Sequence, residues 1–139
     1  MLDICLFLFD SPIKKINLIQ YNKFENKSPD QALVNIRIKN ININLEMSYT
    51  MWKNSFTLDL IGSKGSLHIN SLCKWSKSQV FIRKRKFPSG KPNEKIINFK
   101  KGDPTWQLEN QFFLNKVKIK SKTNLTKDIL INTNLNKLF

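Results

Sequence analysis

Apolar and polar residues alternate along the middle of the chain and predict a β-hairpin there. Over 41–49 every odd position is apolar or aromatic and every even position is polar, which is the period of a strand with one buried face. Residues 56–60 repeat the alternation, and 67–69 resume it after Gly62-Ser63-Lys64-Gly65. Glycines tolerate positive φ, so this segment predicts a tight turn between two antiparallel strands.

The sequence predicts helices at both ends of the chain. Residues 1–9 are almost wholly apolar and stop at Asp10-Ser11-Pro12, which predicts a buried helix that ends before the proline. Asp103 as N-cap and Pro104 as first helical residue predict a helix start, because a carboxylate accepts the unpaired N–H groups there. A second C-terminal helix is predicted from about 124.

Further strands are predicted on both sides of the hairpin. The clearest lies at 32–38, a weaker one at 13–21, and short ones at 80–85 and 96–99. Most of them follow one another through connections of hairpin length, which favours antiparallel pairing. The expected fold is α+β, a single domain over 1–139 with an open, mostly antiparallel β-sheet of about six strands and helices packed on one face.

The charge balance raises the question of a nucleic acid or an anionic membrane as partner. The chain has 24 basic and 10 acidic residues, a net charge of +14. Of the basic residues 21 are Lys and 3 are Arg, and Asn and Ile are frequent, as an A+T-rich genome would give. Phosphate-binding sites favour the Arg fork. A small basic nucleic-acid-binding protein is therefore kept as the alternative function.

The basic run Arg83-Lys84-Arg85-Lys86 is the strongest candidate for a phosphate-binding patch. Alternation along a strand would send the two arginines to one face and the two lysines to the other. A solvated strand edge, which lysines protect against edge-to-edge pairing, is therefore the preferred interpretation.

Cysteine usage and hydropathy indicate a reduced, cytoplasmic location. Cys5 and Cys73 stand far apart and in no metal-ligand spacing, so neither a disulfide framework nor a zinc site is predicted. The apolar opening differs from a signal peptide, because it lacks a basic region, carries Asp3 and contains only six consecutive apolar residues. No segment is long enough to span a membrane.

Several short motifs occur in an order that resembles a known family. The chain reads S-Y-T-x-W-x-N-x-F-x-L-x-L-I-G-S-K-G-S-L-H-I over 48–69, then L-C-K-W at 72–75, K-R at 84–85, P-S-G-K-P at 88–92 and T-W-Q-L-E at 105–109. In this order the motifs resemble the C-terminal domain of the Gfo/Idh/MocA family of NAD(P)-dependent oxidoreductases, which act mostly on sugars, cyclitols and sugar derivatives. The resemblance covers nearly all of the chain.

The resemblance implies a substrate-binding and oligomerisation domain of an oxidoreductase acting on a sugar or sugar derivative. In that family a Rossmann domain holds NAD or NADP, a lysine lies in an E-K-P motif, and the histidine of a G-x-H-x-x-D segment serves in proton transfer. The chain has neither a G-x-G-x-x-G turn nor E-K-P. With Asp3 at the last position of G-x-H-x-x-D, the histidine would precede Met1. We therefore expect a truncated or split gene product without catalytic residues, which binds no cofactor and is inactive alone.

Partners follow from the resemblance and from the first predicted helix. Its apolar residues point almost all the way round, so one sheet can bury only one side of it. In the family the Rossmann domain covers the other side. We expect a large exposed apolar surface, with self-association through the sheet or a separately encoded Rossmann domain as partner. A sugar would bind only with that partner, and neither a membrane nor a nucleic acid is expected.

Four residues are candidates for contacts with a sugar. Asp3 matches the family's active-site segment, and Tyr49, Trp52 and Trp75 carry rings of the kind that stack on the C–H faces of sugars. Structural interpretations are preferred for all four: a helix start for Asp3 and packing for the rings. His68, the only histidine, has no carboxylate or cysteine at ligand spacing and is expected to be a surface or cross-strand residue.

Overall fold

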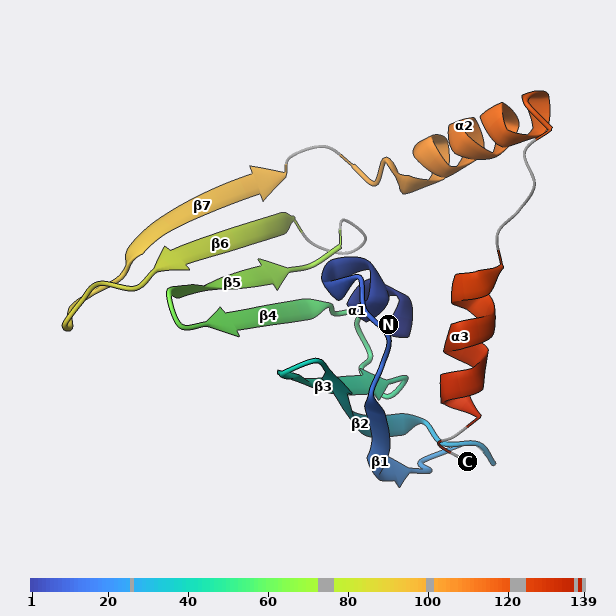
Figure 1. Cartoon of the computed structure of the whole chain (residues 1–139), viewed down its shortest axis with the longest axis horizontal. Helices are drawn as coiled ribbons and strands as arrows, with labels where there is room; N and C mark the ends of the chain where they lie inside the picture. The colour runs from blue at the N-terminus through green and yellow to red at the C-terminus, as the bar shows by residue number, and fades with distance from the viewer. Residues whose placement is uncertain (26, 73–76, 100–101, 121–124, 137, 139) are drawn as a thin grey trace. The chain divides into compact units, whose positions relative to one another are not determined.

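The computed structural model describes residues 1–25, 27–72, 77–99, 102–120, 125–136 and 138. The chain divides into two compact units, one formed by Met1–Trp52 with Lys122–Phe139 and the other by Lys53–Ser121. Within the described ranges there are three helices and seven strands, and every strand pairing is antiparallel (Figure 1).

The first unit contains a three-stranded sheet and two helices. Its elements are α1 (Leu2–Phe9), β1 (Lys15–Asn22), β2 (Gln31–Ile38), β3 (Ile41–Ser48) and α3 (Thr126–Leu135), and β2 lies between the other two strands. In the register, Ile36 of β2 faces Ile16 on β1 and Ile43 on β3. The predicted alternation therefore brings apolar side chains from all three strands to one face.

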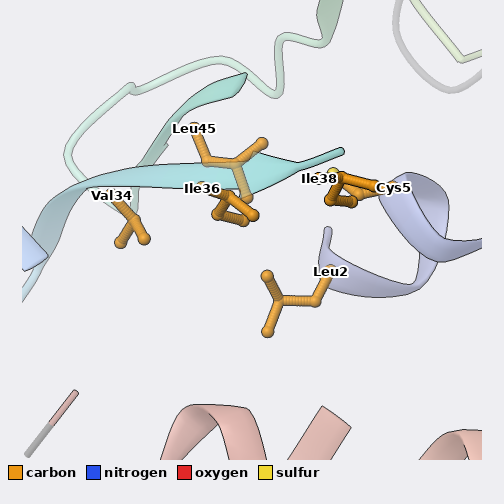
Figure 2. Close-up of a cluster of buried hydrophobic side chains, with 6 residues drawn as sticks. All are labelled: Leu2, Cys5, Val34, Ile36, Ile38 and Leu45. Atoms are coloured by element: carbon orange, nitrogen blue, oxygen red, sulfur yellow. The ribbon is translucent and has the colours of Figure 1, made fainter. Parts of the chain in front are cut away.

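The core of this unit lies between that face and the helices. The buried cluster comprises Leu2, Cys5, Val34, Ile36, Ile38 and Leu45 (Figure 2). The three β2 residues among them are at most 2% exposed. Ile131 of α3 and Leu138 pack against the cluster as partly buried side chains. Full burial of a large aliphatic side chain contributes about 1.5–3 kcal/mol, so β2 contributes most to this core.

A buried carboxylate organises the connection between β1 and β2. Asp30 is 5% exposed, and its Oδ2 accepts hydrogen bonds from the backbone N–H groups of Phe24 (2.7 Å) and Glu25 (3.0 Å). Its backbone carbonyl accepts another from the N–H of Tyr49 at 2.8 Å. Bonds to an ionised acceptor are stronger than bonds to a neutral one. Asp30 therefore joins the β1–β2 connection to the end of β3.

The second unit contains a four-stranded meander and one helix. Its elements are β4 (Thr57–Gly62), β5 (Gly65–Asn70), β6 (Ser78–Lys84), β7 (Asn93–Phe99) and α2 (Thr105–Lys118), with the strands in the order β4-β5-β6-β7. Gly62 pairs with Gly65, which leaves Ser63 and Lys64 as a two-residue turn. The turn predicted from the sequence is thus confirmed.

The C-terminal helices lie close to their predicted positions. Pro104 is the N-cap of α2, so this helix begins one residue later than predicted. The Asp103 Oδ1 accepts hydrogen bonds from the N–H and the hydroxyl of Thr105, at 3.0 and 2.5 Å, but Asp103 lies one residue before the N-cap, so its prediction as N-cap is wrong. α3 begins at Thr126, near the predicted start at 124.

The α+β class and the open antiparallel architecture are confirmed, and α1 and α3 pack on one face of the three-stranded sheet. The described strands form two sheets, of three and four strands, whereas the sequence predicts one sheet. β3 ends at Ser48, β4 begins at Thr57, and the residues between them belong to neither sheet. Alternation tells which residues share a face, but it does not tell which strand edges pair.

Replacing Gly65 with alanine should destabilise the second unit. A Cβ there would lie against the Arg83 carbonyl oxygen on β6, closer than van der Waals contact permits, so the β5–β6 ladder must shift. We expect a loss of about 1–3 kcal/mol in the free energy of unfolding, measured by urea denaturation. Gly62→Ala is the matched control, because its Cβ would meet only the Gly65 carbonyl oxygen at an ordinary 3.7 Å. Equal losses for both variants would contradict the steric explanation.

Candidate functional site

Two of the predicted sugar contacts, Tyr49 and Trp52, carry their side chains in solvent. Tyr49 directly follows β3 and is 90% exposed, and Trp52 is 85% exposed. The interpretation of these two rings as packing residues is therefore wrong. Exposed aromatic rings of this size gain little from their own unit, and they are available to a ligand or another surface.

The other two predicted contacts do not join them. Asp3 lies exposed in the first turn of α1, where an acidic side chain favours the helix. Trp75 lies outside the described residues. Between Asp3, Tyr49 and Trp52 the described structure shows neither a ring contact nor a hydrogen bond. They are separate exposed groups.

A hollow on the face of the three-stranded sheet opposite the core is lined by polar side chains. The lining residues are Gln20, Tyr21, Asn22, Gln31, Leu33 and Glu46. The Asn22 amide donates to Gln31 at 3.2 Å and the Gln31 amide donates to Glu46 at 3.0 Å, so polar groups connect across the three strands. Amides and carboxylates can bind the hydroxyl groups of a polar ligand. The sequence signal for this hollow is the polar character of Gln20, Asn22, Gln31 and Glu46, which equally marks a solvated face.

His68 has a carboxylate partner, whereas the sequence predicted no carboxylate beside it. Asp59 faces it across the β4–β5 ladder, and His68 Nδ1 lies 2.7 Å from Asp59 Oδ1. The two residues are nine positions apart and become neighbours only in this register. His68 also contacts the Phe81 ring, with 5.6 Å between ring centroids. It is therefore a cross-strand residue on the polar face of the sheet, as expected.

The opposite face of the four-stranded sheet has two mainly aliphatic rows. The first row is Leu58, Ile69, Val80 and Ile97. The second has Lys95 on β7 and three aliphatic residues, Leu60, Leu67 and Ile82. The seven aliphatic side chains, which we call the aliphatic face, are half-buried. α2, the helix of this unit, has no buried residue. The described part of the unit therefore supplies no second layer for this face.

Two helices also present apolar side chains to solvent. α1 buries Leu2, Cys5 and Leu6, whereas Phe7 is 76% exposed and Leu8 is 40% exposed. Large apolar residues of α2 are exposed throughout the helix: Trp106, Leu108, Phe112, Phe113, Leu114 and Val117. Apolar surface of this extent marks an interaction site in a folded protein.

The basic run differs from its prediction in two respects. β6 lies between β5 and β7, so the interpretation of the run as a solvated strand edge is wrong. Strand alternation places Arg83 and Lys84 on opposite faces of the sheet. Because β6 ends at Lys84, alternation does not determine which way Arg85 and Lys86 point. Arg83 is paired with Glu94 of β7, with 2.5 Å between Nε and Oε2. The basic residues beyond the strand end belong to a loop.

The described residues offer little to metal or thiol chemistry. No three of their His, Cys, Asp and Glu side chains lie together as metal ligands. Cys5 is buried in the core, and burial raises the pKa of its thiol because apolar surroundings disfavour the thiolate. None of the described helices combines the length and the apolar character needed to cross a membrane.

No model of a protein family, no curated protein and no solved structure matches the chain. The interpretation of function therefore depends on the motifs and surfaces themselves.

Replacing Phe7 with serine should reduce association of the protein and its binding of an apolar dye. Because Phe7 is mostly in solvent, the free energy of unfolding should change by less than about 1 kcal/mol. Leu6→Ser, at the neighbouring position and 5% exposed, should cost about 3 kcal/mol or more. Light scattering, dye fluorescence and urea denaturation measure the three quantities. A larger stability loss for Phe7→Ser than for Leu6→Ser would show that α1 packs through its other side.

Proposed function

We propose that the chain is the substrate-binding and oligomerisation domain of a Gfo/Idh/MocA-type oxidoreductase that acts on a sugar or sugar derivative. The observation that carries the proposal is the aliphatic face, which lies within the stretch whose motifs resemble that family. An open sheet with a half-buried apolar face is suited to receive a second layer. In an oligomerisation domain, the same face of another copy provides that layer.

Exposed groups of the first unit support a role in sugar binding. The rings of Tyr49 and Trp52 are open to the C–H faces of a sugar, and the Asp3 carboxylate is open to its hydroxyl groups. NAD or NADP would be held by a Rossmann domain, where the nicotinamide supplies the hydride chemistry. That domain would also cover the exposed Phe7 and Leu8 of α1. The residues of this chain would bind and orient the substrate.

If two copies associate through the aliphatic face, Leu60→Asp should dissociate them. A carboxylate buried in an apolar interface is costly, so the dissociation constant should rise about 100-fold or more. Ile61→Asp is the matched control, because Ile61 is the next residue on β4, points to the opposite face and is 88% exposed. Sedimentation velocity gives the oligomeric state, and far-UV circular dichroism verifies that both variants keep their strands. A monomeric unmodified protein, or equal effects of the two substitutions, would refute this use of the face.

The protein alone should not bind a nicotinamide cofactor. Its four glycines occur at 62, 65, 90 and 102 and form no phosphate-binding G-x-G-x-x-G turn. Isothermal titration calorimetry with NAD⁺ and with NADP⁺ should give dissociation constants weaker than about 1 mM. Micromolar binding of either cofactor would contradict the proposal that cofactor binding belongs to a Rossmann domain and not to residues 1–139.

A further inference from the structure

The β4–β5 and β6–β7 connections lie at the same end of the four-stranded sheet (Figure 1). The β4–β5 turn and the β6–β7 loop both leave the sheet where Gly62, Gly65, Lys84 and Asn93 align. The backbone N–H of Arg85 donates to the Lys64 carbonyl at 2.9 Å, and its guanidinium donates to the Ser63 carbonyl at 3.4 Å. These bonds hold the loop against the turn. We call residues 62–65 and 84–92 the basic tip.

The basic tip concentrates positive charge without neutralisation. Its basic side chains are Lys64, Lys84, Arg85, Lys86 and Lys91, all exposed. The ranges 60–66 and 84–93 contain no acidic residue, and the next acid along the chain, Glu94, is engaged by Arg83. Five like charges on one end of a sheet repel one another. A polyanion bound there relieves this repulsion and releases its own counterions.

An exposed aromatic ring stands among these charges. Phe87 is 66% exposed, and the Arg85 guanidinium carbon lies 4.4 Å from its ring centroid. A ring with Arg on one side can stack on a nucleic-acid base through its other side. Such stacking accepts unpaired bases of any sequence. A membrane would instead favour several apolar side chains around the charges, and the loop supplies one ring, partly covered by Arg85.

We propose that the basic tip binds single-stranded nucleic acid, with its lysines on the phosphates and Phe87 stacked on a base. This surface is separate from the aliphatic face and does not depend on the function proposed above. One of the three arginines in the chain, Arg85, lies in it, and arginine is the residue type that phosphate sites prefer.

Binding of a fluorescein-labelled single-stranded 20-mer DNA to the full chain, followed by fluorescence anisotropy at several salt concentrations, tests the proposal. The test variant is Lys86→Gln/Lys91→Gln, in the loop of the tip. The control is Lys118→Gln/Lys127→Gln, which removes the same net charge from exposed positions on α2 and α3. At about 50 mM salt the tip variant should bind about tenfold more weakly, and its slope of log K against log salt should be shallower by about 1.4.

Phe87→Ala gives an independent readout. Loss of a stacking ring should weaken binding by about tenfold and leave the salt slope unchanged, because no phosphate contact is removed. The charge control should bind the oligonucleotide within twofold of the unmodified protein. Thermal unfolding verifies that each variant is folded.

Three outcomes would overturn the proposal. One is absence of binding by the unmodified chain at low salt. Another is an equal loss in the tip and control variants, which would mean diffuse attraction by the net charge. The third is tip-dependent binding to vesicles that contain anionic phospholipid but not to the oligonucleotide, which would assign the tip to a membrane surface.

Discussion

Burial of β2 is the interaction on which the first unit depends. Val34, Ile36 and Ile38 are closed in by a strand on each side and by helical side chains over their face. A small sheet is marginal without a layer of this kind, because each strand alone cannot remove enough apolar surface from water. The same constraint decides which side of α1 is buried. A helix offers one stripe to one layer, so Leu2 and Cys5 enter the core and Phe7 does not.

The second unit lacks a comparable layer in its described part. Its strands are joined by complete antiparallel ladders and a tight turn, while the aliphatic face is only half-buried. Backbone hydrogen bonds contribute modest net free energy, since the unfolded chain makes similar bonds with water. If the unit associates through this face as proposed, its stability is coupled to that association. A partner that binds only the folded sheet stabilises it by mass action, and the folded sheet in turn presents the binding surface.

The parts of the structure that depend on residues adjacent in the sequence could be predicted from it. The strands follow from period-2 alternation, the turn follows from Gly62 and Gly65, and α2 begins directly after Pro104. The contact between His68 and Asp59 depends on strand register, and the role of Asp30 depends on where a loop folds back. Neither has a local signal. Exposure of Tyr49 and Trp52 could not be predicted either, because an aromatic side chain is compatible with a core and with a surface until the layer above it is known.

Two lysines beside the aliphatic face restrict the symmetry of any dimer that associates through it. Lys84 and Lys95 point to the same side of the sheet as Leu60 and Ile82, and both lie toward the end that carries the basic tip. In a two-fold symmetric pair, a residue near the axis meets its own counterpart. A lysine there would face a lysine in an apolar setting, which is strongly unfavourable. The axis must therefore pass near the row of Leu58, Ile69, Val80 and Ile97, where all four strands are aliphatic, and the two tips would point outward from opposite ends of the pair.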